Sequence, residues 1–119
     1  MAKTIFDRCG GFANVSKMVM AFYDKVLDSD VIGHHFEDIE ISKLVDHQTK
    51  FIASVMGGPA AYTDDALHRM HQHLKIDREQ FEEMAALLEE TLEDFDLEKK
   101  DIDEVMAQIR GRARHVITM

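Results

Sequence analysis

The chain has 119 residues, of which 45% are hydrophobic and 31% charged. This balance is typical of one globular domain over residues 1–119 and excludes a disordered chain. The formal net charge of −9 disfavours nucleic acids and anionic membranes as partners, because both are polyanions. The single Cys9 excludes an internal disulfide framework. Apolar runs are too short for a membrane span or a signal peptide, so we expect a cytoplasmic protein.

The first part of the chain is predicted to be helical. A short helix is expected over residues 2–9, and Gly10-Gly11 then breaks the pattern. Asn14 is the expected N-cap of a helix over residues 15–27, since Asn side chains accept hydrogen bonds from the first turn. The apolar side chains of this segment recur at helical spacing, at Val15, Met18, Val19, Phe22, Tyr23 and Val26.

The middle of the chain combines a turn, a helix and a loop-rich stretch. An irregular turn is expected at residues 32–36, followed by a helix over residues 41–56. Gly57-Gly58-Pro59 ends that helix, because glycine and proline commonly follow a helical C-terminus. Residues 60–76 are expected to form loops, with a short helix over residues 66–72.

Two further helices are predicted in the last third of the chain. Asp77 and Gln80 form a capping-box pattern at the start of a helix that extends to about residue 95. A final helix is expected over residues 98–116. No stretch alternates apolar and polar residues as a half-buried strand would, so the fold class is predicted to be all-α.

Histidines are the main candidates for chemistry. The zinc-protease pattern HExxH is absent, and no Glu is followed by a His three residues later, as di-iron bundles require. His68 and His71 could share a helix face one turn after Asp65. These residues would make an incomplete zinc or nickel site in a small helical regulatory domain, and that alternative predicts a colourless protein.

His47 and His71 are more informative as a pair. Each lies three or four residues from apolar side chains, which are Leu44 and Phe51 for His47, and Leu67 and Leu74 for His71. A single histidine of this kind is most often an ordinary core or boundary residue. Two on separate helices, facing many Phe and Met side chains, also suit a flat apolar group such as haem, whose iron binds a neutral imidazole.

The order of short motifs gives a more specific indication. They are Gly10-Gly11, Phe22-Tyr23-Asp24-Lys25-Val26-Leu27, Phe36-Glu37-Asp38, His47-Gln48-Thr49-Lys50-Phe51, Gly57-Gly58-Pro59, Tyr62, Met70-His71, Phe81 and Thr91-Leu92. In this order the sequence resembles the group I truncated haemoglobins, the two-over-two helical globins, over essentially the whole chain. Groups II and III usually carry a Trp where Met84 stands, and this chain has no Trp. The resemblance therefore favours group I.

The resemblance implies a haem b cofactor and a role for each matching residue. His71 would be the proximal iron ligand, and Phe36 would wedge against the haem face. The distal wall would consist of Tyr23, Leu44, His47 and Gln48. Lys43 would meet a haem propionate. The remaining haem contacts implied by the resemblance are Phe51, Ile52, Leu67, Leu74, Phe81 and Met84.

Several functions are compatible with this resemblance. Tyr23 would donate a hydrogen bond to bound oxygen, and Gln48 would either donate a second one or orient Tyr23. O2, NO and CO are the expected ligands. Nitric oxide dioxygenation would need an external reductase, whereas oxygen storage or sensing would not. His47 could itself bind the iron and give a six-coordinate haem suited to redox chemistry. We expect a monomer or a weak dimer.

The chain also departs from the family pattern. Asp64 and Asp65 stand where a glycine and a basic residue are usual, and His34 and His35 precede Phe36. His115 lies near the end of the last helix, where some cyanobacterial members carry a histidine that bonds covalently to haem.

Overall fold

The computed structural model describes residues 4–36, 40–58 and 76–112. Those residues form helices and no strand, which confirms the all-α prediction. The elements are α1 (Ile5–Cys9), α2 (Gly11–Asp28), the 3₁₀ helix η1 (Gly33–Phe36), α3 (Ile41–Val55), α5 (Arg78–Asp94) and α6 (Lys99–Gly111). Within the described part of the chain, no helix combines the length and apolar character needed to cross a membrane.

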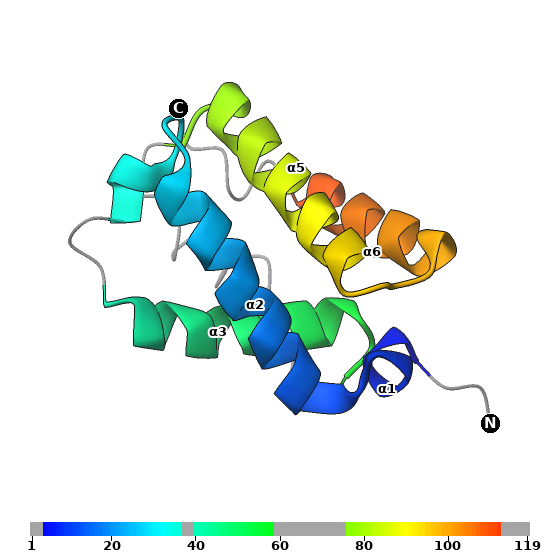
Figure 1. The fold of residues 1–119 in the computed structure, drawn as a ribbon. Coiled ribbons are helices and arrows are strands. Elements are labelled where there is room, and N and C mark those ends of the chain that lie inside the picture. The colour runs from blue at the N-terminus through cyan, green and yellow to red at the C-terminus, as the bar shows by residue number, and fades with distance from the viewer. Residues whose placement is uncertain (1–3, 37–39, 59–75, 113–119) are drawn as a thin grey trace.

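The four long helices form two pairs. α2 crosses α3, and α5 lies alongside α6 after a tight turn (Figure 1). α2 also packs on α5, and α3 contacts α6, so the two pairs enclose one core. This arrangement is a two-over-two helical sandwich.

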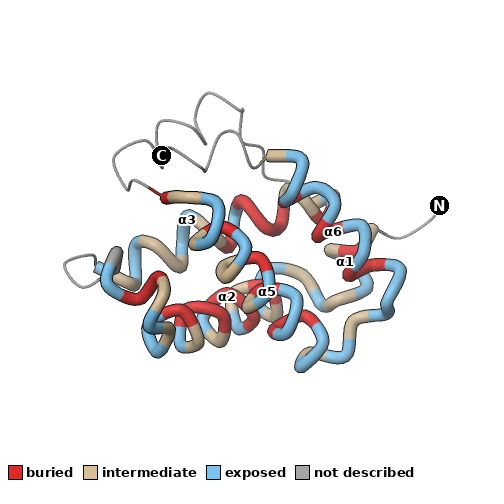
Figure 2. Tube along the Cα trace, turned by 90° about the horizontal axis from the view of Figure 1, so that it is seen from above, coloured by how far each residue is buried: buried red, intermediate tan, exposed pale blue. Residues whose placement is uncertain are grey.

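The core forms where the apolar stripes of these helices meet. Buried residues follow the inward side of each helix, and exposed residues follow the outer side (Figure 2). The largest fully buried side chains are Phe81, Met56, Leu92, Val15, Val26, Val105 and Thr91. Burying each large apolar side chain contributes about 1.5–3 kcal/mol, so this core is the main source of stability.

Glycines allow α1 to lie directly against the end of α3. Gly57 has φ 87°, and a Cβ at Gly58 would lie 2.8 Å from Cδ1 of Phe6. The Phe6 amide donates to the Met56 carbonyl over 3.0 Å. A side chain at Gly58 would therefore separate the two helices. The Gly57-Gly58 pair both ends α3 and holds α1 in place.

An ion pair connects α1 to the start of α6. Nη2 of Arg8 lies 2.6 Å from Oδ1 of Asp101, whose side chain is almost fully buried. The neighbouring carboxylate raises the pKa of Arg8, so the guanidinium stays charged. Removing Arg8 would leave the buried carboxylate of Asp101 without this ion pair at the edge of the core.

The helices predicted within the described residues are confirmed, and one cap assignment is wrong. The helix predicted over residues 66–72 and the predicted end of the last helix at residue 116 lie outside the described residues. α2 begins at Gly11, so Asn14 lies inside the helix and its Nδ2 donates to the Cys9 carbonyl over 2.8 Å. The left-handed conformation of Gly10, with φ 106°, lets α2 follow α1 almost directly. The Asp77 capping box is confirmed, since its carboxylate accepts from the Gln80 amide over 2.8 Å.

Candidate functional site

Tyr23 lies on the inward side of α2 and is 5% exposed. Its ring packs edge-to-face against Phe22, with the ring centroids 5.1 Å apart. Burial raises the pKa of Tyr23 well above its ordinary value. The hydroxyl therefore stays protonated at neutral pH and can donate a hydrogen bond.

α3 presents two different sides to the rest of the molecule. One side is buried and includes Thr49. The Thr49 hydroxyl has a hydrogen-bond partner within the same helix, since it donates to the Val45 carbonyl over 2.6 Å. The second side runs along the helix at spacings of four, three and four residues, and we call it the α3 stripe. Its members are Leu44, Gln48, Phe51 and Val55, of which Phe51 is buried and the others half-buried. Gln48 is thus a polar group within a mostly apolar surface.

His47 and Lys43 lie beside the α3 stripe and not within it. His47 is exposed. Lys43 is also exposed, and its Nζ lies 3.6 Å from Oε2 of Glu40. Both residues stand on the flank of α3, where basic groups can meet the charged edge of a ligand that contacts the α3 stripe.

The apolar candidates of α3 and α5 lie in the core or against it. Phe51, Ile52 and Phe81 are buried in one cluster, and Met84 packs on its edge. Arg112, at the end of α6, places its guanidinium carbon 6.0 Å from the centroid of the Phe51 ring. The candidates from α3 and α5 therefore belong to the same core.

The remaining candidates fall outside the described residues. Leu67, His71 and Leu74 lie there, as do Tyr62, Asp64, Asp65, His68 and His115. Phe36 is the last residue of η1, and its side chain is also outside the described part. Within the ranges 4–36, 40–58 and 76–112, no group of three His, Cys, Asp or Glu residues is placed to hold a metal ion.

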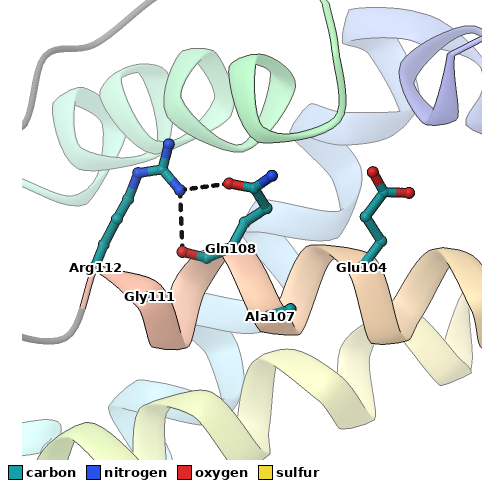
Figure 3. A pocket seen from close by; sticks show the side chains of 5 residues that line it. All are labelled: Glu104, Ala107, Gln108, Gly111 and Arg112. Atoms are coloured by element: carbon teal, nitrogen blue, oxygen red, sulfur yellow. Dashed lines mark hydrogen bonds between the residues drawn. The ribbon is translucent and has the colours of Figure 1, made fainter.

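Surface hollows among the described residues include two that involve α6. One, of about 360 Å³, is lined by Glu104, Ala107, Gln108, Gly111 and Arg112 (Figure 3). Nη1 of Arg112 donates to the carbonyl and to Oε1 of Gln108 along its edge. A second hollow, of about 420 Å³, lies at the turn between α5 and α6 and is rich in acidic residues.

The donor set fits a haem that carries a diatomic ligand. Tyr23 and Gln48 offer one neutral O–H and one neutral amide N–H, and neither is an anion that would repel a polarised gas molecule. The apolar members of the α3 stripe suit the flat face of a porphyrin.

Comparisons with known proteins decide the family. The bacterial-like globin family matches residues 4–118. A group 1 truncated haemoglobin of Synechocystis sp. is 30% identical over 116 residues, covering 94% of this chain and 93% of the relative. The chain belongs to the group 1 truncated haemoglobins. Its cofactor is therefore haem, as the sequence resemblance predicted.

Further relatives of this truncated haemoglobin agree in fold. A group 1 truncated haemoglobin of Tetrahymena thermophila is 28% identical over 114 residues, covering 96% of this chain and 88% of the relative. The crystal structure of the 2/2 haemoglobin from Synechococcus sp. PCC 7002, in the cyanomet state with covalently attached haem, superposes with a TM-score of 0.90. The two sequences are 24% identical, and the match covers 98% of this chain and 100% of the Synechococcus chain.

Two residues next to the candidates on α3 were not predicted as site residues of this truncated haemoglobin. Val55 continues the α3 stripe, and its helical spacing from Phe51 was a usable signal. Arg112 reaches Phe51 from α6. No sequence pattern marks that contact, because it depends on how α6 packs against α3.

Proposed function

We propose that this truncated haemoglobin binds oxygen and other diatomic gases reversibly, and that it converts nitric oxide to nitrate with an external reductase. The observation that carries the proposal is the buried hydroxyl of Tyr23, a neutral donor on the helix that crosses α3. Haem, when bound, would supply a redox-active iron for gas binding, and the external reductase would supply the one electron that each nitrate formed requires.

The chain's own residues would hold the cofactor and orient the gas. We assign the proximal bond to His71 and the haem-facing apolar contacts to Phe36, Leu67 and Leu74, as the family resemblance implies. The α3 stripe would cover the opposite face and exclude water from it. Lys43 would neutralise a propionate, since its flexible side chain can exchange Glu40 for that anion.

Tyr23 would stabilise the bound gas directly. A hydrogen bond to a group that carries charge contributes roughly 1.5–3 kcal/mol, about a ten- to hundredfold slowing of oxygen release. Gln48 would donate a second hydrogen bond or orient the Tyr23 hydroxyl. Slow release keeps oxygen in place until nitric oxide arrives, which is the requirement for dioxygenation.

Stopped-flow mixing of the oxygen-loaded protein with nitric oxide tests this function. We expect fast and complete conversion to nitrate, and repeated turnover when a reductase and its reductant are present. Slow or incomplete conversion would remove the dioxygenase role and leave oxygen storage. A colourless protein after addition of haem would contradict both.

A six-coordinate resting state is a second candidate, because the family resemblance implies that a histidine at the position of His47 can bind the iron. This residue immediately precedes Gln48 and lies between Leu44 and Phe51 in sequence, on the edge of the α3 stripe. If His47 binds the iron, an incoming gas must displace it, which lowers the apparent affinity by the fraction of His47 bound. His47→Ala should then change a low-spin ferric spectrum to high-spin. Identical spectra would leave His47 as an exposed or propionate-binding residue.

A further inference from the structure

The exposed large apolar side chains of the described residues all lie on one helix. They are Phe12, Met20 and Leu27 of α2, with 42%, 56% and 44% of their surface exposed. Single exposed apolar residues are common on protein surfaces, but Met20 and Leu27 are seven residues apart and so lie on the same face of α2. α2 lies along one edge of the molecule, so its outer face is accessible to a partner (Figure 2).

The outer face of α2 has a regular seven-residue spacing. Ala13, Met20 and Leu27 are each seven residues apart, so they form one line along the helix, which we call the α2 seam. Lys17 and Asp24 are also seven residues apart and lie on one flank of this seam. Both are exposed, and neither makes an ion pair within the described part of the structure. The face therefore combines an apolar line with one cation and one anion.

We propose that two copies of this chain associate through the α2 seam, with the two helices antiparallel and the two-fold axis at Met20. In that arrangement a residue seven positions before Met20 faces the residue seven positions after it. Leu27 of one copy therefore packs against the small Ala13 of the other. The two Met20 side chains meet at the axis, where each flexible thioether can adjust its conformation to pack against the Met20 of the other copy.

Charge complementarity selects both the occupant and the direction. A two-fold axis places the flanks that carry Lys17 and Asp24 on the same side of the helix pair. Lys17 of one copy then lies within about one residue's rise, ~1.5 Å, of Asp24 in the other copy. The symmetry makes two such pairs. A parallel two-fold arrangement would instead place the two flanks on opposite sides of the helix pair, so Lys17 and Asp24 would form no such pairs.

The size of the seam limits the strength of the association. An 18-residue helix is about 27 Å long, so one helix face buries less than the ~800 Å² per partner of a standard interface. The net charge of −9 on each copy also opposes association. The dimer is therefore weak and depends on protein concentration.

Sedimentation of the haem-loaded protein, up to roughly 1 mM, tests the proposal. We expect reversible dimerisation, and we expect Met20→Glu to weaken it at least about tenfold by placing two carboxylates at the axis. Ala86→Glu adds the same charge on an exposed position of α5 and should leave dimerisation unchanged. A protein that stays monomeric throughout, or a dimer that survives Met20→Glu, would overturn the proposal.

Charge exchange tests the antiparallel direction. Lys17→Asp alone and Asp24→Lys alone should each weaken the dimer, because each creates like-charge pairs. The double variant should restore it to near its original affinity. A double variant weaker than both single variants would overturn the antiparallel arrangement. The haem absorption spectrum of each variant confirms that it is folded.

Cross-linking offers an independent measurement. Met20→Cys in a Cys9→Ser background should form a disulfide between copies under mild oxidation, because packed helices bring facing Cα atoms within reach of one. Ala86→Cys in the same background is the matched control. Equal cross-linking of the two variants would contradict an interface at Met20.

Discussion

Gly58 is a position where a single methyl group should disrupt the packing of α1 against α3. An Ala at this position would place its Cβ 2.8 Å from Cδ1 of Phe6 and 2.9 Å from the Ala53 carbonyl oxygen. That oxygen already accepts the Gly58 amide over 2.7 Å, so the backbone has little room to move away. Relieving the contacts requires α1 to shift from α3. Overpacking of this kind costs about 1–3 kcal/mol.

Thermal unfolding of the haem-loaded Gly58→Ala protein measures this cost. A loss of about 1 kcal/mol lowers the Tm of a small domain by roughly 4–8 °C. Gly111→Ala is the matched control, because nothing lies within 4 Å of a Cβ there. Replacing a helical glycine in open space should leave the Tm unchanged or raise it. If Gly58→Ala is as stable as Gly111→Ala, the close packing of α1 on α3 is not needed for stability.

Three further variants test other parts of the structure. Asp77→Ala removes the capping box of α5 and should cost about 1 kcal/mol in denaturant unfolding, whereas the exposed Glu79→Ala should cost less. Leu92→Ala empties a fully buried position and should cost about 2–5 kcal/mol; a loss below that range would mean the core collapses around the gap. Because burial raises the pKa of Tyr23 above its ordinary value of 10, the unfolded chain releases this proton first. Stability should therefore fall above pH 10, less steeply in Tyr23→Phe, and equal slopes would contradict the burial of this hydroxyl.

The sequence predicted a helix correctly wherever the cap or the apolar stripe is formed by residues of that helix alone. The start of α5 follows from Asp77 and Gln80, which satisfy each other's backbone amides without help from the rest of the fold. The start of α2 was misplaced at Asn14, because Asn is a common N-cap. The helix instead begins directly after Gly10, whose left-handed conformation no side-chain pattern specifies.

The site was predictable in part for the same reason. Helical spacing places Tyr23 on the inward side of α2, and the structure buries it. His47 is three residues from Leu44 and four from Phe51, yet it lies on the exposed flank of the α3 stripe. A residue at the edge of an amphipathic face can be either buried or exposed, because this depends on which edge of the face the neighbouring helices cover. The Arg112 contact with Phe51 is likewise a property of packing.

The oxygen dissociation rate of Tyr23→Phe tests the central claim most directly. The substitution removes one hydroxyl and keeps the buried ring, so the core around Phe22 should remain intact. If Tyr23 is the main donor to the bound gas, oxygen should leave at least about tenfold faster than from the unmodified protein. A dissociation rate equal to that of the unmodified protein would contradict the claim.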